Sequence, residues 1–345
     1  MKPLDHLLER AGAAPRHIVL AEGADPRVLD AAVRAAHHGM SLPILIGDRS
    51  LIEAGLRERG ANLSRFRLED PATSPLRDRF VGRYLDHRRA KGATEADAAA
   101  AMSDPMGFAA MMVREGEADG MVGGAVATTA HTVRTALQII GRAKDVKLVS
   151  SFFLMMLCAP EHKKKGAFLF ADCGLVVDPD ADELAEIALA SARSYAALIG
   201  EEPRVAMLSF STMGSASHAR IDKVVQATAK VRLSAPALAV DGELQFDAAF
   251  VPMVNSAKAP GSATRGEANV FVFPNLEAGN IGYKIAQRIG GAVAIGPVLQ
   301  GLAKPANDLS RGCDADEVHA MIAITTVQAN AQTAMRSDAG ALAEA

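Results

Sequence analysis

One short segment near the C-terminal end combines the residue types that acyl and phosphoryl transfer need. Asn307-Asp-Leu-Ser-Arg-Gly-Cys-Asp-Ala-Asp-Glu317 holds a hydroxyl at Ser310, a guanidinium at Arg311 and several carboxylates. A planar guanidinium suits phosphate, and a carboxylate can act as a general acid or base. Asp314 and Glu317 also have the D-x-x-E spacing of a capping box, so these acids have a structural explanation as the start of a helix.

A second segment has the composition of an anion-binding turn. Gly123-Gly-Ala-Val-Ala-Thr-Thr-Ala-His-Thr-Val-Arg134 begins with glycines after an expected strand, and glycines let backbone N–H groups approach an anion. Thr128 and Thr129 add hydroxyl donors, Arg134 adds a cation, and the N-terminus of the helix that follows is electropositive. The segment predicts a phosphate or carboxylate site, although a turn with a helix cap explains the same residues equally well.

A third segment, His87-Arg-Arg-Ala-Lys-Gly92, is strongly basic. It could bind a phosphate-bearing ligand, but taken alone it is better explained as a solvated helix end, where the helix dipole favours Lys and Arg. Together the three segments indicate an anion site with at least two arginines, a hydroxyl donor and a carboxylate.

The sequence lacks the fingerprints of common cofactor sites. It contains no GxGxxG that opens a helix after a strand, no GxxxxGK[ST] and no HExxH, and its nine histidines are dispersed. Its three cysteines form no CxxC pair, which argues against a zinc ribbon and against a disulfide framework. NAD binding by the usual fingerprint, P-loop phosphoryl transfer and zinc-protease chemistry therefore lose support, and no metal site is expected.

Short β-rich runs alternate with helical stretches along the chain, which predicts parallel strands joined by helical crossovers. Between two apolar runs the polar Glu161-His-Lys-Lys-Lys-Gly predicts a hairpin turn. Asp180 and Glu183 have capping-box spacing, and Gly200 marks the end of the same helix. The expected strands are 17–21, 43–47, 118–126, 146–157, 167–171, 205–210, 237–241 and 269–273, and the clearest expected helices are 27–38, 132–140, 180–199 and 315–334.

Length and composition set the broad class. A chain of 345 residues suggests about two domains, and 49% hydrophobic residues supply ample material for a core. The 37 basic and 40 acidic side chains leave a net charge of −3, which argues against a general nucleic-acid binder. No signal-peptide core is present, and no apolar run reaches the roughly 18 residues that a membrane span needs. We therefore expect a soluble cytoplasmic protein that binds neither nucleic acid nor membrane.

Several segments resemble the phosphate acetyltransferase (phosphotransacetylase) family, within the phosphate acetyl/butyryltransferases. They follow the family's order over nearly the whole chain, from about Ile18 to Ala329, and the Asn-Asp-Leu-Ser-Arg-Gly-Cys motif is highly specific. The matching segments are Ala118-Asp-Gly-Met-Val-Gly-Gly-Ala, Thr132-Val-Arg-Thr-Ala-Leu-Gln-Ile-Ile, Asp241-Gly-Glu-Leu-Gln-Phe-Asp-Ala-Ala, Lys258-Ala-Pro-Gly-Ser, Phe273-Pro-Asn-Leu-Glu-Ala-Gly-Asn-Ile-Gly-Tyr-Lys284 and Gly296-Pro-Val-Leu-Gln-Gly-Leu-Ala-Lys-Pro-Ala-Asn-Asp-Leu-Ser-Arg-Gly-Cys313.

The resemblance implies an α/β fold of two lobes with a cleft between them, similar to the isocitrate/isopropylmalate dehydrogenase fold. It places residues 1–144 and 296–345 in a discontinuous first lobe that carries the Ser-Arg loop. Residues 145–295 then form a second lobe with a dimerisation role. It also implies an active site in the cleft, a cytoplasmic homodimer in acetate metabolism, and no metal or cofactor, with CoA, acetyl-CoA, phosphate and acetyl phosphate as substrates.

Site residues carry over by position. Ser310 and Arg311 match the family's catalytic pair, and Glu317 stands seven residues after the serine, where the family has its catalytic aspartate. Asp316 lies beside it and keeps the family's residue type, so the acid–base assignment is open between the two and we favour Glu317. The positions that match substrate-binding residues are Arg88, Arg134, Thr128, Thr129, Asn280, Tyr283 and Lys284.

The sequence departs from the family in two further places. Ala127 and His131 stand where the family usually has His and Asp around the Thr-Thr pair. The stretch from Cys173 to Asp178 lacks the usual asparagine. Both differences could alter acyl preference or kinetics.

The activity that follows is a phosphate acetyltransferase, an acyltransferase that moves acetyl between CoA and inorganic phosphate in a ternary complex. Three alternatives remain: a phosphotransacylase for propionyl- or butyryl-CoA, a metal- and NAD-dependent dehydrogenase on the same fold, and a non-catalytic acyl-CoA sensor. The dehydrogenase needs clustered acids for Mg²⁺, and the sequence shows none apart from the capping-box acids.

Overall fold

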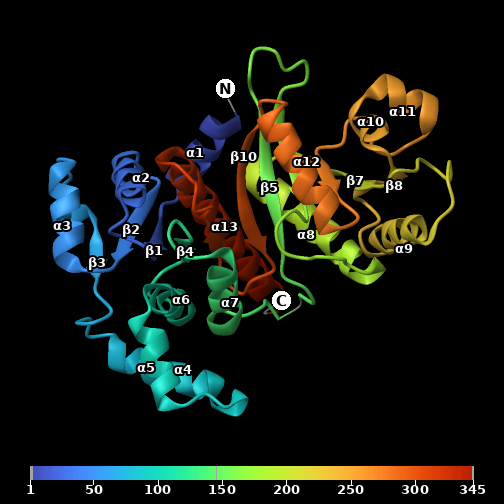
Figure 1. Ribbon diagram of the computed structural model, residues 1–345. Helices are drawn as coiled ribbons and strands as arrows, with labels where there is room; N and C mark the ends of the chain where they lie inside the picture. The colour runs from blue at the N-terminus through green and yellow to red at the C-terminus, as the bar shows by residue number, and fades with distance from the viewer. Residues whose placement is uncertain (1–2, 145, 344–345) are drawn as a thin grey trace. The chain divides into compact units, whose positions relative to one another are not determined.

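The computed structural model describes residues 3–144 and 146–343 of the chain (Figure 1). The chain divides into two compact units, each with its own sheet. Unit 2 combines Asp5–Lys144 with Leu302–Ala345, and unit 1 contains Asp145–Gly301 with the first four residues. Unit 2 is therefore discontinuous in sequence and is closed by the C-terminal segment.

The sheet of unit 2 has the strand order β11-β4-β1-β2-β3, and every pairing is parallel. From the central β1 the chain adds β2 and β3 on one side, and later β4 and β11 on the other. The direction of winding therefore changes between β1 and β4. The strands are β1 (Arg16–Leu20), β2 (Ser41–Ile46), β3 (Arg67–Glu69), β4 (Gly120–Gly123) and β11 (Ala306–Asp308).

Local capping explains where several helices of unit 2 begin. Asp25 and Asp104 each accept backbone N–H groups at a helix start, and a proline takes the first helical position after each. The α-helices of this unit are α1 (Pro3–Ala13), which begins within unit 1, α2 (Pro26–His37), α3 (Arg49–Glu58), α4 (Arg77–Arg88), α5 (Glu95–Ser103), α6 (Pro105–Glu115), α7 (Thr129–Ile139) and α13 (Ala315–Ala343). Two short 3-10 turns cover Leu63–Arg65 and Arg89–Lys91.

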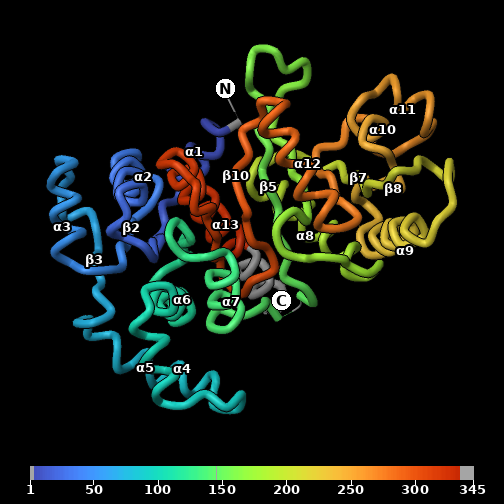
Figure 2. Tube along the Cα trace, viewed as in Figure 1, coloured from blue at the N-terminus to red at the C-terminus, as the bar shows by residue number. Residues whose placement is uncertain are grey.

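Helices cover both faces of β4, and two glycines make room for them. A Cβ on Gly120 would overlap Thr325 of α13, and a Cβ on Gly123 would overlap Met106 of α6. Residues three apart on a strand point to opposite faces, so α13 and α6 lie on opposite sides of the sheet. Figure 2 shows the red C-terminal segment running among the blue and teal elements of this unit.

Unit 1 has a six-stranded mixed sheet of order β10-β5-β6-β9-β7-β8. The predicted hairpin is confirmed: β5 pairs antiparallel with β6, from Phe152 opposite Ala171 to Leu157 opposite Gly166. β10 also pairs antiparallel with β5, and the remaining pairs are parallel. The strands are β5 (Ser150–Leu157), β6 (Gly166–Ala171), β7 (Arg204–Leu208), β8 (Ala239–Leu244), β9 (Val270–Val272) and β10 (Val293–Gln300).

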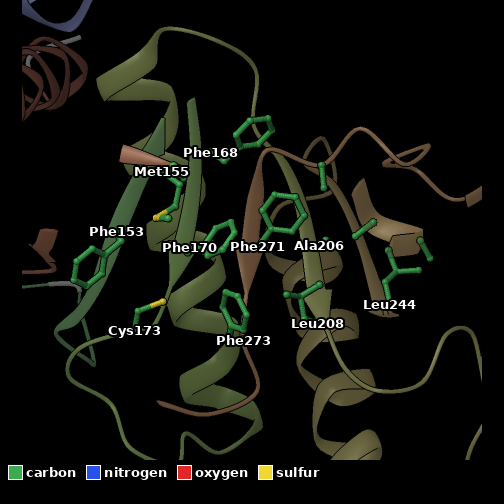
Figure 3. Packing of buried hydrophobic residues seen from close by; sticks show 14 of the residues in the cluster. Phe153, Met155, Phe168, Phe170, Cys173, Ala206, Leu208, Leu244, Phe271 and Phe273 are labelled. Carbon is green, nitrogen blue, oxygen red and sulfur yellow. The ribbon is translucent and has the colours of Figure 1, made fainter. Parts of the chain in front are cut away.

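The core of unit 1 is rich in phenylalanine (Figure 3). Phe168 and Phe170 alternate on β6, so both point to one face of the sheet, and Phe271 of β9 packs against them with ring centroids 6.2 and 5.4 Å away. The predicted helix α8 (Ala181–Ile199) has its capping box and ends at Gly200. The other helices are α9 (Ala219–Ser234), α10 (Phe246–Phe250), α11 (Pro252–Lys258) and α12 (Leu276–Arg288).

The second junction between the units lies a few residues later than the sequence analysis placed it. β10 runs through residue 296 to Gln300 and pairs with β5 over most of that length. Residues 296–300 therefore belong to unit 1, because the strand that contains them is part of its sheet, and the unit ends at Gly301.

Candidate active site

The predicted catalytic loop lies at the carboxyl edge of the unit 2 sheet. In doubly wound sheets, ligands bind beyond the carboxyl ends of strands where the winding direction changes, which here is between β1 and β4. The backbone N–H of Ala21, just after β1, donates to Val122 of β4 at 3.0 Å. The N–H of Leu309, just after β11, donates to Gly123 at 2.7 Å. The edge therefore brings together segments that lie near residues 21, 124 and 310.

Ser310 and Arg311 are both exposed on this loop. Among the described residues, the Ser310 hydroxyl accepts one long hydrogen bond, 3.3 Å, from the N–H of Gly312. Within the described part of the chain the Arg311 guanidinium has no hydrogen bond or ion pair, whereas its backbone carbonyl accepts a hydrogen bond from another side chain. A solvent-facing hydroxyl and guanidinium on an anchored backbone are suited to bind an anionic substrate.

Arg27 supplies that anchor, and the sequence analysis missed it. Its Nη1 donates to the carbonyls of Arg311 (2.8 Å) and Cys313 (3.1 Å), and its Nη2 donates to Ala125 (2.8 Å). Asp25, the N-cap of α2, forms an ion pair with Arg27 at 2.8 Å, and this contact lowers the pKa of the Asp25 carboxyl. One guanidinium therefore ties the catalytic loop to the glycine turn. In the sequence, Asp25-Pro-Arg27 looks like an ordinary helix start.

Three backbone amides of the glycine turn already have an anionic partner within the protein. The three N–H groups of Ala125, Val126 and Ala127 donate to the carboxylate of Glu22, at 2.6, 3.0 and 2.7 Å. The turn does bind an anion, but this anion is the carboxylate of Glu22, a residue that follows the neighbouring strand β1. These three amides are therefore occupied within the protein and are not free to bind a substrate.

The other predicted residues of this turn have mixed surroundings. Thr128 is the N-cap of α7, and its hydroxyl accepts the N–H of His131 at 3.2 Å. Thr129 is the first residue of α7, and its hydroxyl lies near the buried Asp308. Arg134 is exposed on the same helix. His131, which replaces the family's usual aspartate, lies 2.9 Å from the carboxylate of Asp104.

Arg88 is the last residue of α4, directly before the short turn at Arg89–Lys91. Its side chain is half-buried, and its Nε has no hydrogen-bond partner among the described residues. The adjacent His87 contacts the carbonyl of Gln138 at 3.1 Å, which joins this basic segment to the end of α7. His87 and Arg88 are therefore partly packed onto their unit, whereas residues 89–92 are exposed, as expected of a solvated helix end.

The two candidate acids at the start of α13 have different partners. Glu317 forms the capping box: its carboxylate accepts the N–H of Asp314 at 3.3 Å, and its own N–H donates to the Asp314 carboxylate at 2.9 Å. Asp316 instead pairs with Arg34 of α2 at 2.5 Å, and its side chain is 80% exposed. The choice of Glu317 as acid–base group stays a prediction.

The predicted residues of unit 1 all lie on α12. Asn280 donates to the carbonyl of Cys173 at 3.1 Å, which holds the helix against the loop after β6. Tyr283 stacks on Phe153 with ring centroids 3.9 Å apart, and burial raises the pKa of its hydroxyl. Lys284 is exposed, with its Nζ 5.8 Å from the Tyr283 ring. Asn280 and Tyr283 thus contribute to packing, and Lys284 faces solvent.

Unit 1 also contains a pocket that the sequence analysis did not identify. Its volume is about 810 Å³, and it lies beyond the carboxyl ends of β7 and β9. Phe210 and Phe246 line it and remain 60% and 44% exposed, and Lys223 in its wall pairs with Asp178 at 2.8 Å. Exposed aromatic rings in a pocket were the signal that could have revealed it, but that exposure is a tertiary property.

Among the described residues, no group of three or more His, Cys, Asp or Glu side chains is arranged to hold a metal ion. No helix in that part of the chain is both long and apolar enough to cross a membrane.

The chain is similar to known proteins over nearly its whole length. The family described as Phosphate acetyl/butaryl transferase matches residues 3–326. The chain is similar to the phosphate acetyltransferase of Paracoccus denitrificans, at 52% identity over 328 residues, covering 95% of this chain and 99% of that one. It is also similar to the crystal structure of a phosphotransacetylase from Streptococcus pyogenes, with a TM-score of 0.88 and 43% identity, covering 95% and 98% of the two chains.

A more distant likeness concerns the fold alone. A 4-hydroxythreonine-4-phosphate dehydrogenase from Burkholderia phymatum is 15% identical, with a TM-score of 0.52, covering 92% of this chain and 98% of that one. The predicted α/β class, and its similarity to a dehydrogenase fold, are confirmed.

Proposed function

The chain belongs to the phosphate acetyl/butaryl transferase family, and on this premise we propose that it transfers an acetyl group reversibly between CoA and inorganic phosphate. It is an acyltransferase: acetyl-CoA and phosphate give acetyl phosphate and CoA. The observation that carries the proposal is the Ser310–Arg311 loop, which leaves a hydroxyl and a guanidinium exposed on a backbone that Arg27 holds.

The chemistry is easiest to follow towards acetyl-CoA. A carboxylate, which we assign to Glu317, takes the proton of the CoA thiol. Because a thiol pKa of about 8.5 leaves it mostly protonated at neutral pH, such a base should accelerate the step by roughly 10²–10⁴-fold. The Ser310 hydroxyl donates a hydrogen bond to the thiolate. The thiolate sulfur then attacks the carbonyl carbon of acetyl phosphate and forms a tetrahedral oxyanion.

Collapse of that intermediate breaks the bond between the acyl carbon and the phosphate oxygen. Phosphate leaves with the electron pair of this bond, and Arg311 and Arg134 stabilise its charge. In the reverse direction, the protonated carboxylate returns the proton to the thiolate that leaves. Arg88 binds a phosphate group of a substrate, and Thr128, Thr129, Asn280, Tyr283 and Lys284 make the remaining polar contacts.

Arginines replace a metal ion in this mechanism. Guanidinium groups can supply the positive charge that Mg²⁺ supplies in phosphoryl-transfer enzymes, so no metal or other cofactor is required. Activity that EDTA leaves unchanged would agree with this. Activity that EDTA abolishes and Mg²⁺ restores would contradict it and favour the dehydrogenase alternative.

The protein acts as a cytoplasmic homodimer in acetate metabolism. Support for the dimer comes from α12, where Ile281, Ile285 and Ile289 are 58%, 52% and 84% exposed at helical spacing. Such an exposed apolar stripe is typical of an interaction surface. Light scattering should give twice the monomer mass, and Ile285→Lys should shift that value towards the monomer.

A thiol-release assay tests the function directly. Acetyl-CoA with phosphate should release CoA thiol, and acetyl-CoA alone should not. Arsenate in place of phosphate should make the release run on, because acetyl arsenate hydrolyses. Propionyl- and butyryl-CoA in the same assay measure acyl preference, and faster turnover with either would reassign the substrate. Reduction of NAD with candidate hydroxy acids, and no thiol release, would refute the proposal.

A further inference from the structure

A buried carboxyl group lies directly beneath the catalytic loop. Asp308 ends β11, two residues before Ser310, and its side chain is 0% exposed. Neither of its carboxylate oxygens has a hydrogen-bond partner among the described residues. Burying an unpartnered carboxylate is strongly unfavourable, so folding alone gives no reason for an acid here.

The strand geometry separates Asp308 from its neighbour. Asn307 faces α13, where its side-chain amide donates to Thr325 at 2.9 Å and to Gln328 at 2.7 Å. Successive residues of a strand face opposite sides, so Asp308 faces the turn after β4 and the start of α7. There Gly124, at φ +102°, makes room for it, because a Cβ at that position would overlap the Asp308 carboxylate. The backbone at Gly124 therefore packs directly against the Asp308 carboxyl group.

The neighbours of the carboxyl include a predicted substrate-binding residue. The hydroxyls of Thr129 and Thr132 and the backbone N–H of Leu309 lie beside Asp308 and lower its pKa, although none of the three completes a hydrogen bond of normal geometry. Burial has the larger effect, the nearby charge of Glu22 acts in the same direction, and together they raise the pKa of Asp308 to about 6. The carboxyl thus lies between the Ser-Arg loop and the first residue of α7.

We propose that Asp308 is a positioning residue for acetyl transfer: its buried carboxylate faces the start of α7 and sets the direction of the Thr129 hydroxyl. A hydroxyl has one proton to donate, so the group that faces it decides whether a ligand meets a donor or an acceptor. This inference rests on the proposed function and adds a residue to its machinery.

The test is Asp308→Asn, which keeps the size of the side chain and removes the charge. An amide presents both a donor and an acceptor, so the direction of the Thr129 hydroxyl is no longer set. We expect kcat/KM for phosphate to fall on the order of 10- to 100-fold while the melting temperature does not fall. Asp119→Asn is the matched control: Asp119 precedes β4 at the opposite edge of the same sheet and accepts the N–H of His17 at 3.0 Å, so its kinetics should stay unchanged.

A double-mutant cycle checks that Asp308 acts through Thr129. Thr129→Val removes the hydroxyl and should lower kcat/KM, and Thr129→Ser should recover part of that loss. The double variant Asp308→Asn/Thr129→Val should be little worse than either single variant, because both remove the same contact.

Three results would overturn the inference: unimpaired kinetics in Asp308→Asn, a melting temperature well below wild type in that variant, or fully additive losses in the cycle. The proposed function is judged separately, on the wild-type protein. A wild type without phosphate-dependent thiol release would refute that function, whereas an active wild type with an unimpaired Asp308→Asn variant would refute only the role of Asp308.

Discussion

Each of the two sheets has a buried aspartate at the carboxyl end of one of its strands. The two aspartates differ in how many hydrogen bonds their carboxylates accept. Asp172 follows β6 of unit 1 and accepts four hydrogen bonds: from the N–H and hydroxyl of Ser151 at 2.7 and 2.6 Å, and from the N–H groups of Gly174 and Leu175 at 2.7 and 2.9 Å. Asp308 ends β11 of unit 2, and among the described residues it has no hydrogen-bond partner. Both side chains are almost completely buried.

This difference in hydrogen bonding indicates that Asp172 stabilises its unit, whereas Asp308 lowers the stability of its own. The four donors to Asp172 satisfy its carboxylate and shape the loop after β6, although burial still raises its pKa. The edge of unit 2 instead leaves Asp308 unsatisfied and Ser310 and Arg311 exposed. Groups left in unfavourable surroundings are concentrated where function is expected, because substrate rather than the chain completes their contacts.

The largest expected effect is at the exposed guanidinium of that edge. Arg311→Ala should lower kcat on the order of 10²-fold or more, because it removes a charge-assisted contact to the phosphate in the transition state. The melting temperature should stay near wild type, because Arg27 binds the backbone carbonyl of residue 311, which alanine keeps. Steady-state kinetics measure the change in kcat, and a thermal melt measures the melting temperature.

Arg49→Ala is a suitable control, since Arg49 pairs only with Glu53 on the exposed side of α3. A folded Arg311→Ala protein with a near-normal turnover number would remove Arg311 from the mechanism and weaken the contrast between the two edges.

The next effect concerns the two acids at the start of α13. If Glu317 is the acid–base group, Glu317→Gln should lose roughly 10²-fold in rate and melt near wild type, because glutamine also serves in a capping box. Asp316→Asn breaks only the exposed pair with Arg34 and should keep its rate. Thiol release by the two variants decides between them. Loss of rate in Asp316→Asn alone would reverse the assignment, and full activity in both would exclude each as the base.

The same substitution at the two buried aspartates should change stability in opposite directions. In Asp172→Asn the new amide nitrogen replaces one carboxylate oxygen, and either orientation sets it against at least one donor N–H group. One buried donor then loses its acceptor, so we expect the free energy of unfolding to fall by about 1–3 kcal/mol. In Asp308→Asn the substitution removes an unpartnered charge, so the free energy of unfolding should rise at neutral pH.

The gain in Asp308→Asn should depend on pH. The folded pKa is about 6 and the unfolded value is 3.8, so the folded protein binds this proton more tightly. The favourable contribution of Asp308 to the free energy of unfolding of the wild type is therefore fully present below about pH 4, and it is lost as the pH rises to about 6. The variant should gain up to about 3 kcal/mol above pH 6 and little at pH 4. Urea melts at pH 4, 5, 6 and 7 measure this, and a gain that does not change with pH would contradict the buried charge.

Much of the fold could be predicted because its signals are local. The hairpin of β5 and β6 follows from two apolar runs around a polar turn, and it formed as expected. The capping box at Asp180 and the glycine stop of α8 depend on residues within one helix, and both are present. β10 was missed because its sequence, Val293–Gln300, contains glycine and proline, which favour a loop.

The candidate site could be predicted only as a set of residue types. The sequence placed a hydroxyl, guanidinium groups and carboxylates in short motifs, because these groups are chemically distinctive wherever the chain carries them. It also determined the alternation of strands and helices that places such motifs after strands, since side-chain periodicity is a property of the local backbone.

Only the tertiary structure decided which hydrogen-bond donor pairs with which acceptor. Glu22 occupies the amides that a substrate was expected to use, from 103 to 105 residues away along the chain. Arg27 holds the carbonyl of a loop 284 residues away. Within the described part of the chain the Asp308 carboxylate has no hydrogen-bond partner, although the amide nitrogen of its neighbour Asn307 donates two hydrogen bonds. These outcomes depend on strand order and on which face each strand turns to its helices. No local pattern encodes them, because a hydrogen bond between distant segments forms only once the fold has brought those segments together.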